Sequence, residues 1–293
     1  MDAHRTEHTA LRTWGDAREW AIARLRAGAD PTTAPLDADV LLAFALGVAK
    51  EELLAHPERG LAPNDAARFR ALVERRYTGE PVAYLRGFKE FYGLRFRVDP
   101  RVLIPRPETE TLVDAARRFI AGRALRVVDV GTGSGAVACA IAASEPRVRV
   151  IATDLSGDAL IVGRENAAAL GVEGRVEFRR GDLLSPVTEQ VDVVCANLPY
   201  LRDDALEHLV GARTSLAFEP RAAVVAGADG LDLVRRCVSD LPRVLAPGGA
   251  AFFECDPPQA AAIAALIEAQ GMRTDVLRDL TDAQRVVVAS NTS

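Results

Sequence analysis

Residues 126–135 have the sequence Arg126-Val127-Val128-Asp129-Val130-Gly131-Thr132-Gly133-Ser134-Gly135, an apolar strand pattern followed by a glycine-rich turn. Residues 136–143 are small and apolar, and they predict a helix directly after the turn. Glycines in such a turn let the backbone adopt positive φ and come close to a ligand. A strand, a glycine turn and a helix in this order predict one unit of a doubly wound α/β sheet, with a ligand at the carboxyl end of the strand.

Strand and helix patterns alternate from this stretch to the end of the chain. Further strands are predicted at residues 148–153, 176–179, 191–196, 250–254, 273–277 and 285–289. Further helices are predicted at residues 156–170, 231–245 and 258–269. The alternation predicts that residues 108–293 form one α/β domain around a doubly wound, mostly parallel sheet.

The residues before this domain have a different pattern. Helices are predicted at residues 10–26, 37–46, 50–55 and 64–77, the last with Asn64 as its N-cap. No strand pattern is present there, so residues 1–85 are predicted to form a small all-α domain. In residues 86–107, aromatic and charged side chains alternate loosely around Gly93, which predicts a β-hairpin linker.

Composition and charge limit the kinds of partner. The chain of 293 residues is 49% hydrophobic, which predicts a sizeable core, and its net charge of −5 argues against binding nucleic acid directly. Residues 86–107 differ, with six basic and two acidic side chains. They are either a solvated hairpin edge or a contact for an acidic partner or RNA phosphates. No apolar run is long enough to cross a membrane and no signal peptide is recognised, so we expect a cytoplasmic protein.

The cysteines give no sign of a metal site. They stand far apart, without a Cys-x-x-Cys pair, on segments with apolar flanks. Such a pattern is typical of small buried side chains, and no metal ion is predicted. The four residues are Cys139, Cys195, Cys237 and Cys255.

The glycine turn alone leaves two kinds of cofactor open, because Gly131-x-Gly133-x-x-Ala136 also fits the dinucleotide-binding fingerprint. Asp154, at the end of the second strand, is placed to accept hydrogen bonds from ribose hydroxyls of either cofactor. Asp182, after the third strand, is a candidate to contact an adenine amino group, or else an exposed turn residue.

The tetrapeptide Asn197-Leu198-Pro199-Tyr200 follows the fourth strand and favours a methyl donor. The Asn oxygen and a turn carbonyl can each accept an N–H of a planar amino group, and the aromatic ring can pack on its face. An ordinary Asn-x-Pro turn is the alternative. Because the sequence shows no hydride-transfer site with a His or Lys acid/base, we predict methyl transfer to nitrogen, with the glycine turn holding the methyl donor.

Several blocks spread over nearly the whole chain resemble the release-factor glutamine N5-methyltransferase family, known as PrmC or HemK. The proline-arginine-proline run and the layout are specific for this family, whereas the glycine turn is not. The resemblance implies a class I methyltransferase-like fold after a small all-α domain and a hairpin. The matching blocks are Pro81–Gly87, Glu90–Gly93, Ile104–Glu110, Asp129–Gly135, Glu219–Arg221, Asp229–Leu231 and Ala246–Gly249.

The resemblance also implies the donor, the acceptor and their sites. The donor is S-adenosylmethionine, and the acceptor is the glutamine of the Gly-Gly-Gln loop of peptide-chain release factors. Residues 1–85 then help to grip the release factor, and a monomer is expected. The implied cofactor-binding residues are Gly131, Thr132, Gly133, Ser134, Gly135, Asp154, Asp182, Leu183 and Asn197. The implied catalytic and substrate-binding residues are Asn197, Leu198, Pro199 and Tyr200.

Two features keep alternatives open. Phe88, Phe91 and Tyr92 either cover the donor, dock the partner or simply pack the hairpin. The family motif is similar to Asn-Pro-Pro-Tyr, and this chain has Leu198 in place of the first proline. The motif Asn-Leu-Pro-Tyr instead resembles that of the adenine N6-dimethyltransferases of ribosomal RNA. Leu supplies the same backbone carbonyl as Pro but adds an N–H and backbone freedom. The alternatives are a glutamine N5-methyltransferase of a ribosomal protein, an adenine N6-methyltransferase on RNA, and a donor-binding module without catalysis.

Overall fold

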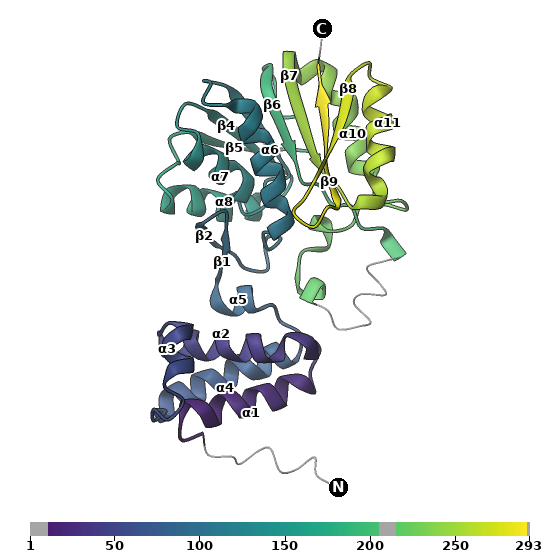
Figure 1. Cartoon of the computed structure of the whole chain (residues 1–293). Coiled ribbons are helices and arrows are strands. Elements are labelled where there is room, and N and C mark those ends of the chain that lie inside the picture. The colour runs from purple at the N-terminus through teal and green to yellow at the C-terminus, as the bar shows by residue number, and fades with distance from the viewer. Residues whose placement is uncertain (1–10, 205–214, 292–293) are drawn as a thin grey trace. The chain divides into compact units, whose positions relative to one another are not determined.

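The computed structural model describes residues 11–204 and 215–291, and these residues fall into two compact units (Figure 1). One unit comprises the described parts of residues 1–87 and 208–218, and the other those of residues 88–207 and 219–293. No helix among the described residues has the length and apolar character that a membrane crossing requires.

The first unit is helical. Its core includes Trp20 and Phe69, whose rings meet edge to face with centroids 6.1 Å apart. The buried guanidinium of Arg76 donates to the Asp37 carboxylate at 2.7 Å, so this internal charge has a partner. The helices are α1 (Trp14–Arg26), η1 (Pro31–Thr33), α2 (Ala34–Leu46), α3 (Lys50–Ala55), α4 (Pro63–Tyr77), α5 (Val82–Arg86) and η3 (Ser215–Phe218).

The structure corrects details of the helix predictions. The N-cap predicted at Asn64 is wrong, because α4 begins at Pro63 and Ala62 takes the cap position. Proline is favoured at the first position of a helix, where its missing N–H costs no hydrogen bond. The short helix α5 was missed because Pro81 was interpreted only as a breaker, whereas it is the N-cap of α5. Ala10, the predicted start of the first helix, lies outside the described residues.

The predicted hairpin is confirmed as β1 (Phe88–Phe91) and β2 (Leu94–Arg97), which pair antiparallel. Tyr92 and Gly93 form its turn with φ of +54° and +70°. The Phe91 ring is buried and lies 6.0 Å from that of Phe96, and the Tyr92 hydroxyl donates to Asp114 at 2.6 Å. These contacts support the interpretation of Phe91 and Tyr92 as packing residues of the hairpin.

The second unit contains the predicted doubly wound sheet of seven strands. The strand order is β5-β4-β3-β6-β7-β9-β8, with β3 to β7 parallel and the last two strands antiparallel to their neighbours. The strands are β3 (Arg126–Val130), β4 (Arg149–Asp154), β5 (Val176–Arg180), β6 (Val191–Ala196), β7 (Leu245–Glu254), β8 (Arg273–Arg278) and β9 (Gln284–Ser290). Only β7 differs much from prediction, because it begins five residues earlier, at Leu245 rather than Ala250.

Helices cover both faces of this sheet (Figure 1). Successive residues of a strand point to opposite faces, and accordingly Val127 belongs to one apolar core and Val128 to the other. The first core includes residues of α6 (Glu110–Ile120), which follows η2 (Pro107–Thr109), and of α7 (Ala136–Ser144) and α8 (Gly157–Ala169). The second includes residues of α10 (Asp232–Val244) and α11 (Ala260–Glu268), the latter preceded by η5 (Pro257–Gln259).

The register of the parallel strands places four polar or glycine positions in one row. The direction of winding reverses between β3 and β6, and ligands of such sheets bind outside the strand ends at this point. The paired residues at the carboxyl edge are Val130 with Thr153, Val130 with Ala196, and Ala196 with Phe253. The residues that follow them lie side by side, in the order Asp154, Gly131, Asn197 and Glu254.

Candidate active site

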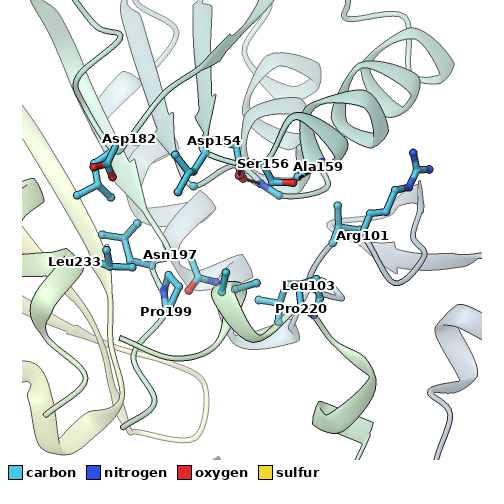
Figure 2. A pocket seen from close by; sticks show the side chains of 18 residues that line it. Arg101, Leu103, Asp154, Ser156, Ala159, Asp182, Asn197, Pro199, Pro220 and Leu233 are labelled. Atoms are coloured by element: carbon cyan, nitrogen blue, oxygen red, sulfur yellow. Dashed lines mark hydrogen bonds between the residues drawn. The ribbon is translucent and has the colours of Figure 1, made fainter. Parts of the chain in front are cut away.

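A cavity of about 370 Å³ opens at the carboxyl edge of the sheet. Figure 2 shows Asp154 and Ser156 across this cavity from Asn197 and Pro199. Eight of the predicted site residues line it: Gly131, Gly133, Asp154, Asp182, Leu183, Asn197, Leu198 and Pro199. The other lining residues had no predicted role at the site: Arg101, Val102, Leu103, Leu155, Ser156, Ala159, Pro220, Ala222, Ala223 and Leu233.

The carboxyl of Asp154 is held by the backbone around it. One oxygen accepts from the Gly133 N–H at 2.9 Å, and the other accepts from the Ser156 N–H at 2.8 Å. Burial raises the pKa of this carboxyl above its usual range, and these N–H groups oppose that effect. Each carboxylate oxygen has a further lone pair, so Asp154 can still accept hydrogen bonds from a ligand hydroxyl.

The glycine turn presents bare backbone to the cavity. Gly131 and Gly133 have φ of +69° and +53°, a region that side chains other than glycine rarely adopt. A Cβ at Gly133 would have no atom within 4 Å, so the space beside this backbone is open to a ligand. A Cβ at Gly131 would lie 3.3 Å from the side chain of Leu198, which packs against the turn.

The other three residues of the predicted turn do not line the cavity, and donor contacts by them stay predictions. The Thr132 hydroxyl donates to the buried Asp129 carboxyl at 2.6 Å, and burial raises the pKa of that carboxyl to about 6. The Ser134 carbonyl accepts from the Asn166 side chain at 2.8 Å. The Gly135 N–H donates to the Thr132 carbonyl at 2.8 Å. These contacts fix the shape of the turn from behind.

The Asp182–Leu183 turn forms another part of the cavity wall. The exposed carboxylate of Asp182 forms an ion pair with Arg236 of α10. Leu183 adopts φ of +50°, and its carbonyl accepts from the hydroxyl of Thr153 at 2.9 Å. Asp182 is thus a turn residue with an exposed carboxylate that also lines the cavity, and an adenine contact stays a prediction.

Asn197 is held by its nitrogen. Its Nδ2 donates to the hydroxyl of Thr109 at 2.9 Å, and within the described parts of the chain its Oδ1 accepts no hydrogen bond. The side chain of Leu198 is buried. The Leu198 carbonyl, like Asn197 Oδ1, accepts no hydrogen bond from any described residue. Two acceptors of neighbouring residues therefore remain available at the cavity wall.

Tyr200 does not line the cavity. Burial, and then the nearby Glu254 and Asp256 carboxylates, raise the pKa of its hydroxyl. Its carbonyl accepts from the side chain of Gln259 at 3.1 Å, which fixes the end of the turn. The predicted packing of its ring on a substrate amide stays a prediction.

A buried carboxylate joins two walls of the cavity and was missed from the sequence. Glu219 is 6% exposed, accepts from the Ile104 N–H at 3.0 Å and forms an ion pair with Arg106. Its neighbour Pro220 and the nearby Leu103 both line the cavity. Glu219 and Arg106 are 113 positions apart in the sequence, so their pairing could not be predicted from it.

The described residues contain no group of three or more His, Cys, Asp or Glu side chains that could hold a metal ion. All four cysteines are free and buried. The polar side chains that line the cavity are the carboxylates of Asp154 and Asp182, the Asn197 amide, the Ser156 hydroxyl and the Arg101 guanidinium. Together with the backbone of the glycine turn, these groups suit hydrogen bonding to an organic ligand.

Two family models match this chain. The model of the PrmC N-terminal domain matches residues 16–87, and that of the methyltransferase small domain matches residues 109–216. A release factor glutamine methyltransferase from Cereibacter sphaeroides is 42% identical over 275 residues, which cover 94% of this chain and 97% of that protein. One from Bordetella pertussis is 42% identical over 263 residues, 88% of this chain and 95% of its own.

Among solved structures, the catalytic domain of hMettl16, in complex with a MAT2A 3′UTR hairpin, has a TM-score of 0.56. It is 15% identical and covers 78% of this chain and 82% of its own, a likeness that concerns the fold alone. The relatives in sequence extend over both units and over every block that carried the resemblance. The chain belongs to the release factor glutamine methyltransferase family.

Proposed function

We propose that this chain transfers a methyl group from S-adenosylmethionine to the side-chain amide nitrogen, N5, of the glutamine in the Gly-Gly-Gln motif of peptide-chain release factors. The observation that carries the proposal is the orientation of the Asn197 side-chain amide. Its nitrogen donates a hydrogen bond to the Thr109 hydroxyl, so its oxygen and the Leu198 carbonyl are available as two acceptors beside one cavity. A primary amide carries two N–H groups on one nitrogen, which is the complementary set of donors.

An amide nitrogen needs placement because its lone pair is delocalised into the carbonyl. Asn197 Oδ1 and the Leu198 carbonyl would accept the two N–H bonds and turn the nitrogen toward the methyl group. Pro199 would stiffen the turn that carries both acceptors. Placement of two reactants at near-contact distance can contribute on the order of 7–11 kcal/mol. The proton that the product nitrogen must lose would leave to water.

The cavity fits S-adenosylmethionine in two respects. The open space beside Gly133 lets backbone approach a ligand, and the Asp154 carboxyl keeps lone pairs for ribose hydroxyls. When bound, S-adenosylmethionine supplies an electrophilic methyl group on a cationic sulfur. The apolar residues of the wall, among them Val102, Leu183 and Leu233, would exclude water from this charge.

The helical unit is the proposed grip for the release factor. The family relationship supports this role, because the model of the PrmC N-terminal domain covers most of residues 1–85. Under the proposal the chain acts as a monomer in the cytoplasm and does not bind nucleic acid directly. The boundaries at residues 85 and 107 are part of the same proposal.

One experiment separates this function from its alternatives. The full chain is incubated with methyl-labelled S-adenosylmethionine and, in parallel, with a release factor, a ribosomal protein and RNA. Label on the glutamine of the Gly-Gly-Gln peptide is expected. Label on the ribosomal protein or RNA, or binding of the donor without transfer, would each replace the proposal by the corresponding alternative.

Asn197→Ala is the variant that connects the activity to the site. Its turnover should be lost while binding of S-adenosylhomocysteine, measured by calorimetry, stays within about threefold, since Asp154 and the glycine turn are unchanged. Undiminished turnover of this variant would overturn the assignment of the two acceptors.

A further inference from the structure

Three elements meet around Asn197. Asn197 follows β6 and Glu254 ends β7, and the register of these strands places the two residues next to each other. Thr109 comes from a third element, the junction of η2 and α6. All three positions are inside the protein, since Thr109 and Glu254 are 3% and 4% exposed and Asn197 is partly buried.

The hydroxyl of Thr109 is free to serve Asn197. Thr109 occupies the N-cap position of α6, where a Thr side chain commonly accepts from the backbone of the helix, but here it makes no such bond. It accepts instead from Asn197 Nδ2. A hydroxyl has one hydrogen to donate, and in this arrangement that hydrogen is left for another acceptor.

The carboxyl of Glu254 is a buried acceptor near Thr109. Burial raises the pKa of Glu254 to about 7, and hydrogen bonding by the Thr109 hydroxyl is the largest effect that opposes this rise. Glu254 Oε2 is buried without a hydrogen-bond partner among the described residues. A buried acceptor of this kind is costly unless a donor turns toward it.

We propose that Thr109 and Glu254 are positioning residues that fix the polarity of the Asn197 amide, so that Oδ1 rather than Nδ2 faces the substrate. An ionised Glu254 can only accept, so it takes the hydrogen of Thr109. Thr109 must then accept from Asn197, which puts Nδ2 against Thr109 and Oδ1 toward the cavity. The inference rests on the proposed function, in which Oδ1 accepts an N–H of the glutamine.

Protonation of Glu254 reverses the direction of both hydrogen bonds, from Thr109 to Glu254 and from Asn197 to Thr109. A carboxylic acid can donate to Thr109, which then keeps its own hydrogen for Asn197. The Asn197 amide would turn over to accept it, and Nδ2 would meet the N–H of the substrate. Turnover should therefore fall as the pH drops through the titration of Glu254. The other titratable and charged groups that act on Glu254, or on which it acts, are Arg106, Glu108, Tyr200, Cys255 and Arg285.

The test compares three variants of the full chain with a full-length release factor. Thr109→Val removes the hydroxyl at nearly constant volume and should lower kcat about tenfold, with the KM for S-adenosylmethionine unchanged. Thr109→Ser, the matched control, keeps the hydroxyl and should recover most of the turnover. Glu254→Gln should lower kcat and abolish the loss of activity toward acid pH that the wild type shows.

The expected outcome separates positioning from mere support of the fold. A reduction of the same size in Thr109→Val and Thr109→Ser would overturn the inference, as would an unchanged pH profile in Glu254→Gln. Wild-type turnover in Thr109→Val would overturn it too.

A second readout keeps the inference distinct from the proposed function. In NMR spectra of the free chain, the side-chain amide protons of Asn197 should exchange slowly in the wild type and in Thr109→Ser, and quickly in Thr109→Val. If the wild type transfers no methyl group to a release factor, the proposed function fails, and this comparison still decides whether Thr109 holds the amide. Equal exchange in all three proteins would refute that role.

Discussion

The side-chain nitrogen of Asn197 donates to the hydroxyl of Thr109 across 2.9 Å, although the two residues are 88 positions apart in the chain. Their meeting depends on the sheet, because the register of β3, β6 and β7 sets Asn197 between Gly131 and Glu254. The site is thus assembled from the ends of neighbouring strands and from the residues just before α6. Substitutions at these strand ends should separate binding of the donor from transfer of the methyl group.

Asp154→Asn should weaken binding of the donor strongly. Both oxygens of Asp154 accept backbone N–H bonds, at 2.9 Å from Gly133 and 2.8 Å from Ser156. An Asn amide has one oxygen only, so its NH₂ group would face one of these donors. We expect the affinity for S-adenosylhomocysteine to fall by about tenfold or more, measured by calorimetry.

Asp182→Asn is the control for this change. Asp182 also lines the cavity, but its ion pair with Arg236 is exposed, and such pairs contribute little. The affinity should change by less than about threefold. Equal losses in the two variants would contradict the assignment of Asp154 as the residue that holds the donor.

Gly131→Ala should impair the site beyond its effect on stability. An Ala at φ of +69° is strained by about 1–2 kcal/mol, and its Cβ would lie 3.3 Å from the Leu198 side chain. Gly122→Ala is matched in strain, with φ of +71°, but its Cβ would meet nothing within 4 Å. Both variants should lose a similar free energy of unfolding in urea, and only Gly131→Ala should lose kcat. Equal kcat values would show that the contact with Leu198 is unimportant.

Leu198→Pro should retain activity. The proposed role of residue 198 uses its carbonyl, which Pro keeps, and among the described residues the Leu198 N–H donates no hydrogen bond that Pro would remove. Leu198→Gly keeps the carbonyl too, but it frees the backbone and removes a buried side chain. We expect Leu198→Pro to stay within about threefold of the wild-type kcat and Leu198→Gly to lose more. An inactive Leu198→Pro would mean that the N–H of this residue takes part in the reaction.

The sequence predicted the sheet well because its strands carry a local signal. Residues 126–130 and 191–196 are apolar runs bounded by turn residues, and both strands have the predicted bounds. The glycine turn and Asn197 could be placed near each other for the same reason, since parallel strands bring their carboxyl ends to one edge. Thus the positions of Gly131, Asp154 and Asn197 at the cavity followed from pattern alone.

The supporting residues could not be predicted in this way, because their partners are distant in sequence. In the sequence, Thr109 was only one member of the block Ile104–Glu110, and Glu254 only the last residue of the strand predicted at residues 250–254. Glu219 pairs with Arg106, which is 113 positions away. Hydrogen bonds of this kind have no period or spacing, so a single sequence contains no sign of them. The short helix α5 was missed for a different reason. Proline occurs both where helices begin and where they end, and Pro81 was interpreted only as an end.

Glu254→Gln should stabilise the protein at neutral to alkaline pH while it lowers activity. Burial raises the pKa of Glu254 from the ordinary 4.5 to about 7, so the folded state holds the proton more tightly than the unfolded state. Between these two values the folded state binds more protons, and the free energy of unfolding therefore falls as the pH rises. Above about pH 7 the full cost remains, on the order of 3 kcal/mol for a shift of this size. Gln carries no charge and escapes this cost.

The difference in unfolding free energy between Glu254→Gln and the wild type should therefore grow from near zero at acid pH to its full size at about pH 8. Urea unfolding at several pH values measures it. Glu173→Gln changes an exposed carboxylate and is the control, with a difference near zero throughout. A constant difference for Glu254→Gln would mean that the carboxyl is ionised at no cost inside the protein.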